Sequence, residues 1–211
     1  MLRPLRVLAC RPDSVGVLVA LALKGAGSVL TFAMLAIAAR AMGPEEFGTF
    51  TIWFSALLFL AVTTVFGQET VVMRDWGRHA GTGDYDRARS ALRRSVLVAL
   101  ALPLAAVPAV AAAATATRHD GWFLACAAAF VVVASYLIVS AHAARTLVDI
   151  RQSDLHGEIT WRIVVIAALG TALALHMPVT ATALLGWAAL GMAVSLAFHI
   201  VAIRRVLAAL P

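Results

Sequence analysis

The sequence has few charged side chains. Asp, Glu, Lys and Arg together make up 13% of its 211 residues, whereas hydrophobic residues make up 62%. An ordinary soluble domain carries about 25% charged residues, and a water-soluble protein of this length could not cover its surface with fewer. The composition therefore excludes an ordinary soluble enzyme and a disordered chain, and it predicts that lipid is the solvent.

Cysteine and enzymatic motifs are also scarce. The two cysteines, Cys10 and Cys126, exclude a disulfide-rich secreted scaffold. The sequence contains no CxxC, GxSxG, HExxH or phosphate-cradling GxxxxGK[ST] pattern, and its six histidines are scattered over different segments. We therefore expect no enzymatic activity, no cofactor and no metal site.

Long apolar runs are the main feature that is present. A helix needs about 20 apolar residues to cross a bilayer core of about 30 Å. Six segments approach or exceed that length, and we expect them to be transmembrane helices at positions 25–42, 49–73, 95–117, 122–141, 159–175 and 182–203. The predicted fold is an all-α integral membrane protein with a six-helix bundle at 24–205, an N-terminal tail at 1–23 and a C-terminal tail at 206–211.

The basic residues predict the orientation of this bundle. If both termini are cytoplasmic, all of the 17 Lys and Arg residues except Arg40 and Arg118 fall on the cytoplasmic side. This is the asymmetry that the positive-inside rule describes. The net charge of +6 is then explained by topology, and no basic stripe with interleaved aromatic residues indicates a nucleic-acid partner.

Ionisable residues at membrane depth are candidates for function, because a charge in hydrocarbon is costly. Lys24 and Glu69 lie at similar predicted depths on adjacent helices. They could form an ion pair in the inner leaflet, with Glu69 as a candidate for ion coupling, or each could extend separately to the interface. We favour the second alternative.

Two arginines near predicted helix ends raise a similar question. Arg40 either pairs with Glu45 or Glu46 across a short turn, or faces an internal cavity where its guanidinium could bind a phosphate. Arg145, at the inner end of the fourth span, presents the same alternatives. Glu158 and Arg162 are four residues apart, a spacing that favours a structural ion pair on one helix.

Proline and small residues add two further expectations. Pro103 and Pro108 lie inside the third span, where each removes a backbone hydrogen bond, so they are candidate hinges or static kinks. Gly186 and Gly191 suit close helix packing. The segment 84–94 is expected to form a short interfacial helix ahead of the third span.

The turn after the first span contains residues that suit a tight connection between helices. Gly43 can end the first helix, Pro44 fits the first turn of a short connection, and Gly48 permits close approach. The surrounding residues 35–74 read LAIAARAMGPEEFGTFTIWFSALLFLAVTTVFGQETVVMR. This segment resembles the signature of the polysaccharide and O-antigen flippases, which belong to the multidrug, oligosaccharidyl-lipid and polysaccharide exporter superfamily.

The resemblance implies a transporter in the bacterial inner membrane that serves lipopolysaccharide or other polysaccharide biosynthesis. Its substrate would be a glycan linked to a polyprenyl pyrophosphate, moved by alternating access between two six-helix halves. The chain covers one such half, so the resemblance implies a second half or a homodimer as partner. By charge and depth, Lys24, Arg40 and Arg145 are the candidate pyrophosphate contacts.

Two other hypotheses stay open. The chain could be a non-transporting remnant or scaffold that binds a polysaccharide synthase. A drug or cation exporter of the same superfamily would need an acidic cavity, and Glu69 is the one carboxylate inside a predicted span. We rank this exporter hypothesis third.

Overall fold

The computed structural model describes residues 14–210, and within that range it consists of helices without strands. Six helical stretches are long and apolar enough to cross a membrane. The helices are α1 (Ser14–Ala41), α2 (Pro44–Val65), α3 (Gln68–Ala80), α4 (Tyr85–Ala116), α5 (Gly121–Leu147), α6 (Ile150–Asp154), the π-helix η1 (Leu155–Thr160), α7 (Trp161–Ala174) and α8 (Ala181–Ala209). The prediction of an all-α membrane protein with six spans is confirmed.

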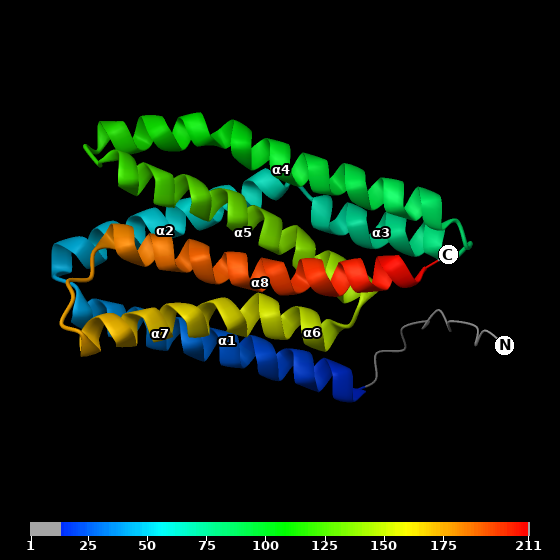
Figure 1. Cartoon of the computed structure of the whole chain (residues 1–211), viewed down its shortest axis with the longest axis horizontal. Helices are drawn as coiled ribbons and strands as arrows, with labels where there is room; N and C mark the ends of the chain where they lie inside the picture. Colours follow the sequence, from blue (N-terminus) through cyan, green and yellow to red (C-terminus); the bar gives the residue numbers. More distant parts are fainter. Residues whose placement is uncertain (1–13, 211) are drawn as a thin grey trace.

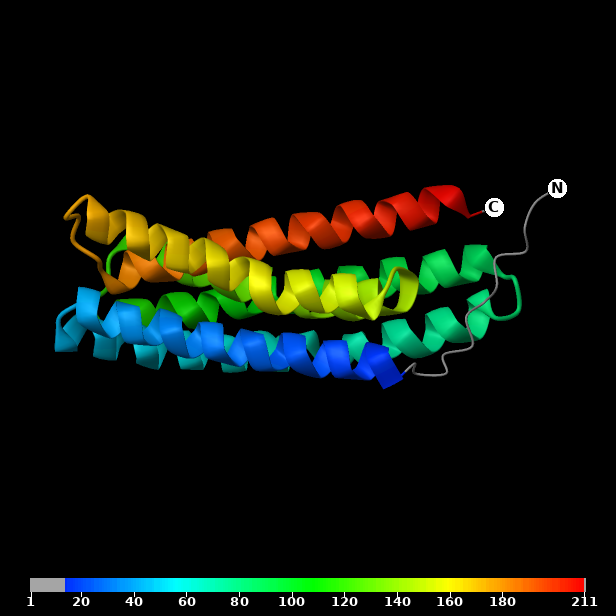
Figure 2. The same cartoon turned by 90° about the horizontal axis from the view of Figure 1, so that it is seen from below.

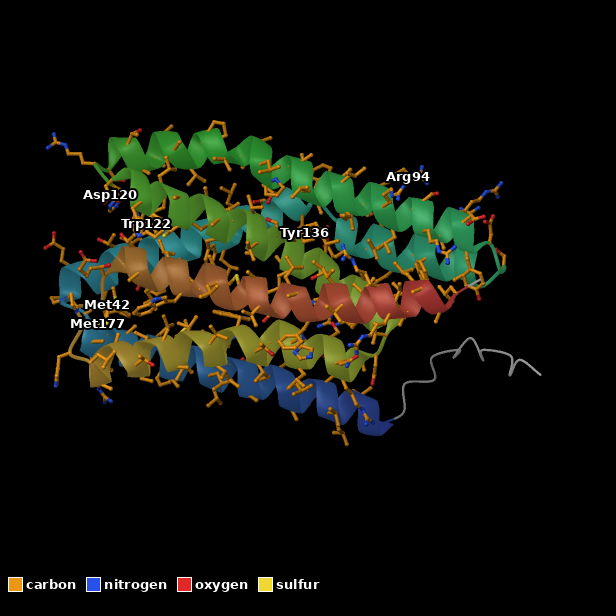
Figure 3. The ribbon with its side chains drawn as sticks, in the orientation of Figure 1. Met42, Arg94, Asp120, Trp122, Tyr136 and Met177 are labelled. Atoms are coloured by element: carbon orange, nitrogen blue, oxygen red, sulfur yellow. The ribbon has the colours of Figure 1, made fainter. Side chains whose placement is uncertain are left out.

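The helices run side by side along one axis (Figure 1). The turns between α1 and α2, α4 and α5, and α7 and α8 lie at one end of the bundle (Figures 1 and 2). The α3–α4 turn, the α5–α6 turn and the C-terminus lie at the other end, which we call the basic end because it carries most arginines of the described chain. Figure 3 shows Arg94 toward the basic end and Asp120 and Trp122 at the opposite end.

Helix α5 lies at the centre of the bundle and contacts α2, α3, α4, α6 and α8. Its buried face includes Phe130, Val131 and Ala134. Large apolar side chains on the outer helices are instead exposed, for example Phe32 (77%) on α1 and Phe59 (71%) on α2. Exposed apolar groups of this size are typical of a surface that faces lipid.

Several predicted boundaries were wrong. Helix α1 already includes residues 14–23, which we expected in the N-terminal tail, because their apolar run continues the helix; residues 1–13 of that tail lie outside the described range. Helix α8 extends to Ala209 and takes up most of the expected C-terminal tail. The segment 84–94 is not a separate interfacial helix, because α4 is continuous from Tyr85 through both Pro103 and Pro108.

The second span is interrupted where the sequence analysis expected one helix. Phe66 and Gly67 both have positive φ, 50° and 75°, so α2 ends there and the amphipathic helix α3 begins at Gln68. Positive φ is sterically easy for Gly67 and unusual for Phe66. Glu69 therefore lies in the first turn of α3 rather than inside a continuous span.

The α1–α2 turn agrees with the sequence analysis in part. Pro44 is the first residue of α2, which therefore begins five residues before the predicted span at 49–73. Gly43 has extended backbone and precedes α2 as its N-cap instead of ending α1 in a left-handed conformation. A Cβ atom at Gly48 would meet no atom within 4 Å, so close packing does not require glycine there.

Close packing does require glycine at position 191. A Cβ atom there would lie 2.6 Å from the carbonyl oxygen of Trp161, which is backbone of the neighbouring helix α7. Because that oxygen cannot move away as the end of a flexible side chain could, the helices α7 and α8 approach closely only with glycine at this position.

We therefore expect Gly191→Ala to lower the free energy of unfolding by about 1–3 kcal/mol, the usual effect of overpacking. Gly170→Ala on α7 is the matched control, because a Cβ atom there meets nothing within 4 Å and alanine favours helix. Thermal unfolding of the purified chain in detergent, followed by circular dichroism, measures both. Equal stability of the two variants would contradict the close contact.

Candidate functional site

A partly open pocket of about 440 Å³, with a mostly apolar lining that includes a group of charged side chains, is bordered by α1, α2, α5 and the stretch from α6 to α7. Its volume is in the range of small-molecule sites. Hydrophobic side chains from α2 and α5 form part of its wall. The charged and histidine side chains that line it are Lys24, His142, Arg145, Asp154, Glu158 and Arg162.

Glu158, on η1, is the centre of one ion-pair cluster. Its Oε1 lies 3.5 Å from Lys24 Nζ on α1, and its Oε2 lies 3.2 Å from Arg162 Nη1 on α7. Arg162 also donates from Nε to Thr31 Oγ1 on α1 at 2.6 Å, and its guanidinium lies 4.4 Å from the centroid of the Trp161 ring. The cluster therefore connects α1 to η1 and α7.

Arg145 and Asp154 form the second ion pair of the cavity. Arg145 Nε donates to Asp154 Oδ1 at 2.8 Å, and Asp154 is 1% exposed. Asp154 Oδ2 is buried and has no hydrogen-bond partner within residues 14–210. A buried carboxylate oxygen without a partner is unusual, since buried polar atoms are nearly always hydrogen-bonded.

A buried histidine supports this side of the cavity. His199 on α8 is 1% exposed, and its Nδ1 lies 3.1 Å from Ser140 Oγ on α5. Its Nε2 lies 3.2 Å from the carbonyl oxygen of Ser153 on α6. Ser153 Oγ in turn donates to the carbonyl oxygen of Ala141 at 2.6 Å. These contacts fix α6 between α5 and α8, and so position Asp154.

The local structure at the cavity is a π-helix. Residues Leu155–Thr160 form η1 between α6 and α7, and π-helical turns occur frequently at functional sites. A Cβ atom at Gly27 of α1 would lie 3.2 Å from Glu158 Cβ, so glycine at position 27 allows α1 to approach η1. The inner loop expected at 142–158 is thus mostly helical, and it brings Glu158 into the fifth span.

The structure brings two of the three candidate phosphate contacts to this cavity. Lys24 and Arg145 line it, whereas Arg40 is exposed at the far end of α1 and does not. Arg40 makes no ion pair within residues 14–210. Glu46 instead accepts a hydrogen bond from the backbone N–H of Ala181 at 2.7 Å and so caps α8.

Glu69 does not line this cavity. Lys24 pairs with Glu158, so the alternative Lys24–Glu69 contact is not formed. Glu69 Oε2 is buried without a hydrogen-bond partner in the described chain. The expected Glu158–Arg162 pair is present, but it also lines the cavity.

Sequence reasoning missed Arg162 and Asp154 as cavity residues. Arg162 lies 12 residues before the end of α7, or about 18 Å at 1.5 Å per residue, which is deep in a core of about 30 Å. That depth alone could have marked Arg162 as an intramembrane charge. Asp154 had no such signal, because its segment was expected to be a loop.

Three cations and two carboxylates give the cavity an excess of positive charge. Both carboxylates already pair with cations, so an entering anion would exchange with Glu158 or Asp154 for the guanidinium and ammonium groups. Chemically, the cavity suits an anionic group such as a phosphate. No family model, curated protein or solved structure matches the chain.

The buried Arg145–Asp154 pair is expected to stabilise the fold. Asp154→Asn is expected to lower the free energy of unfolding by roughly 2 kcal/mol, the size of a charge-assisted hydrogen bond. The double variant with Arg145→Gln should lose less than the sum of the single losses, because the two residues interact. Chemical or thermal unfolding in detergent measures this cycle.

The exposed pair Arg74–Asp75 is the control for that cycle. Its N–O distance is 3.2 Å, but 72% of the Arg74 side chain is exposed. A solvent-screened pair contributes about 0–1 kcal/mol. A coupling energy as small for Arg145–Asp154 as for Arg74–Asp75 would show that the cavity pair does not stabilise the fold.

Proposed function

We propose that this multi-pass membrane protein is a flippase half that carries a glycan linked to polyprenyl pyrophosphate across the bacterial inner membrane. The observation that carries the proposal is the cation-rich cavity within an apolar six-span bundle, where Lys24, Arg145 and Arg162 converge. A pyrophosphate offers several anionic oxygens to such groups, while a polyprenyl tail can stay in lipid. The resemblance of residues 35–74 to polysaccharide and O-antigen flippases supports the same substrate class.

The size of the cavity supports a transporter that needs a partner to complete the substrate path. A volume of about 440 Å³ accommodates a phosphate group and its nearest sugar more readily than a long glycan. Alternating access in such transporters uses two halves that rock around a site between them. We therefore propose that a second six-helix half, or a second copy of this chain, completes the path for the glycan.

Binding of polyprenyl pyrophosphate tests the proposal directly. Lys24→Gln is expected to weaken binding to the purified full chain by about tenfold, which corresponds to about 1.4 kcal/mol. Arg40→Gln is the matched control, since it removes a positive charge from the same helix outside the cavity. Equilibrium binding of radiolabelled polyprenyl pyrophosphate in detergent measures both, and equal weakening by the two variants would overturn the cavity as the site.

A cation exporter is the alternative that a specific observation favours. The cavity holds two carboxylates, and Asp154 Oδ2 has no partner in the described chain. An exporter would bind a lipophilic organic cation such as tetraphenylphosphonium, and Asp154→Asn would abolish that binding. Binding of the organic cation without binding of the pyrophosphate lipid would replace the flippase proposal with this one.

A transport assay distinguishes the flippase hypothesis from the scaffold hypothesis. Proteoliposomes containing the chain, alone or with its crosslinked partner from native membranes, should move a labelled polyprenyl-pyrophosphate glycan between leaflets. A chain that binds a synthase in those membranes and moves no lipid would be a scaffold.

A further inference from the structure

A second and larger cavity lies on the other side of α5. It is a groove of about 820 Å³ between α4, α5 and α8, and it shares no lining residue with the candidate site. Its walls are apolar side chains of all three helices. We call it the basic groove, after the arginines that line it: Arg89, Arg93 and Arg204.

The arginines lie at the level of lipid headgroups. Arg93 is 23 residues from the outer end of α4 at Ala116, and Arg204 is 23 residues from the start of α8 at Ala181. At 1.5 Å per residue, each lies about 35 Å from the end of the bundle opposite the basic end, which is just beyond a hydrocarbon core of about 30 Å. Both guanidiniums therefore reach the same headgroup layer.

The remaining groove extends from that layer toward the membrane centre. Tyr136, also in its lining, is 15 residues from the start of α5, or about 23 Å. Figure 3 places Tyr136 nearer the middle of the bundle than Arg94. Between these levels the lining is mostly aliphatic: Val96, Val139, Ala143, Ile200 and Ile203. The groove is thus cationic at the interface and apolar within the hydrocarbon region.

The charges in the groove are unbalanced. Arg93 and Arg204 make no ion pair with any other residue in 14–210. Arg89 donates from Nη2 to the carbonyl oxygens of Leu207 and Leu210, at 3.2 and 3.1 Å, and so closes the end of the groove by tying α4 to α8. The one carboxylate in the lining, Asp86, is 3.7 Å from Arg89 and 97% exposed.

We propose that the basic groove binds an acidic glycerophospholipid of the leaflet at the basic end. Its phosphate would lie between Arg93 and Arg204, and its acyl chains would follow the aliphatic wall toward Tyr136. Two arginines without carboxylate partners favour an anionic over a zwitterionic headgroup, and basic pockets between transmembrane helices suit such headgroups. A soluble phosphate would leave the apolar part of the groove unfilled, so the combined chemistry favours a lipid.

Native mass spectrometry of the full chain in detergent, titrated with phosphatidylglycerol or with phosphatidylcholine of the same acyl chains, tests this proposal. The chain should retain phosphatidylglycerol at least tenfold more tightly. The double variant Arg93→Gln, Arg204→Gln should lose that preference. The double variant Arg94→Gln, Arg205→Gln is the matched control, because it removes the same charge from the adjacent positions of the same helices, outside the groove.

A second variant tests the groove without changing any charge. Ile200→Trp fills the groove while leaving every arginine in place, and it should also weaken phosphatidylglycerol binding. Circular dichroism establishes that each variant is folded. Equal losses in the two arginine pairs would indicate diffuse attraction to anionic lipid and overturn the site, as would equal retention of phosphatidylcholine or displacement of the lipid by glycerol 3-phosphate.

Discussion

The pairing of Glu158 holds the first helix in the bundle. Helix α1 packs mainly on α6, η1 and α7 and only slightly on α2, its neighbour in sequence. Across that contact, Glu158 faces Lys24 and accepts from Arg162, and Arg162 donates to Thr31. The Arg162 side chain is 14% exposed and that of Glu158 is 28% exposed, so these two charges depend on each other more than on the Lys24 ammonium, whose side chain is 53% exposed. Lys24, Glu158 and Arg162 also line the candidate cavity, so the same contacts that join α1 to η1 and α7 form one of its walls.

The number of helices and their common direction could be predicted from the sequence, because both depend on local properties. Apolar length fixes how many segments cross a bilayer, and the distribution of arginine fixes which ends lie together. Helix ends were less predictable. Residues 14–23 and 85–94 continue the long helices α1 and α4, where a tail and a separate short helix were expected. Residues 150–158 contain polar groups that a sequence pattern assigns to a loop, but neighbouring helices and capping contacts keep them helical. Asp84, for example, accepts from the N–H of Arg87 and starts α4.

The composition of the cavity was harder to predict, since it depends on long-range contacts. Depth along a helix selected Lys24 and Arg145, which line the cavity, and also Arg40, which does not, because depth does not say which side of a helix faces the interior. The partner of Lys24 is Glu158, far away in the sequence. The four-residue spacing of Glu158 and Arg162 was fully explained by an ion pair along one stretch of helix. That explanation gave no reason to expect that both residues also contact α1.

The two cavities differ in how their cations are balanced, and this difference suits different ligands. In the candidate site, both carboxylates pair with cations. An anion must therefore displace Glu158 or Asp154 before it binds. The carboxylate can later return to its cation and release the anion. Such exchange lowers affinity and permits release, which a transporter requires. In the basic groove, Arg93 and Arg204 have no carboxylate competitor in the described chain, so an anionic headgroup gains their full attraction. Under both proposals, helix α5 would separate a site for a travelling lipid from a site for a resident one.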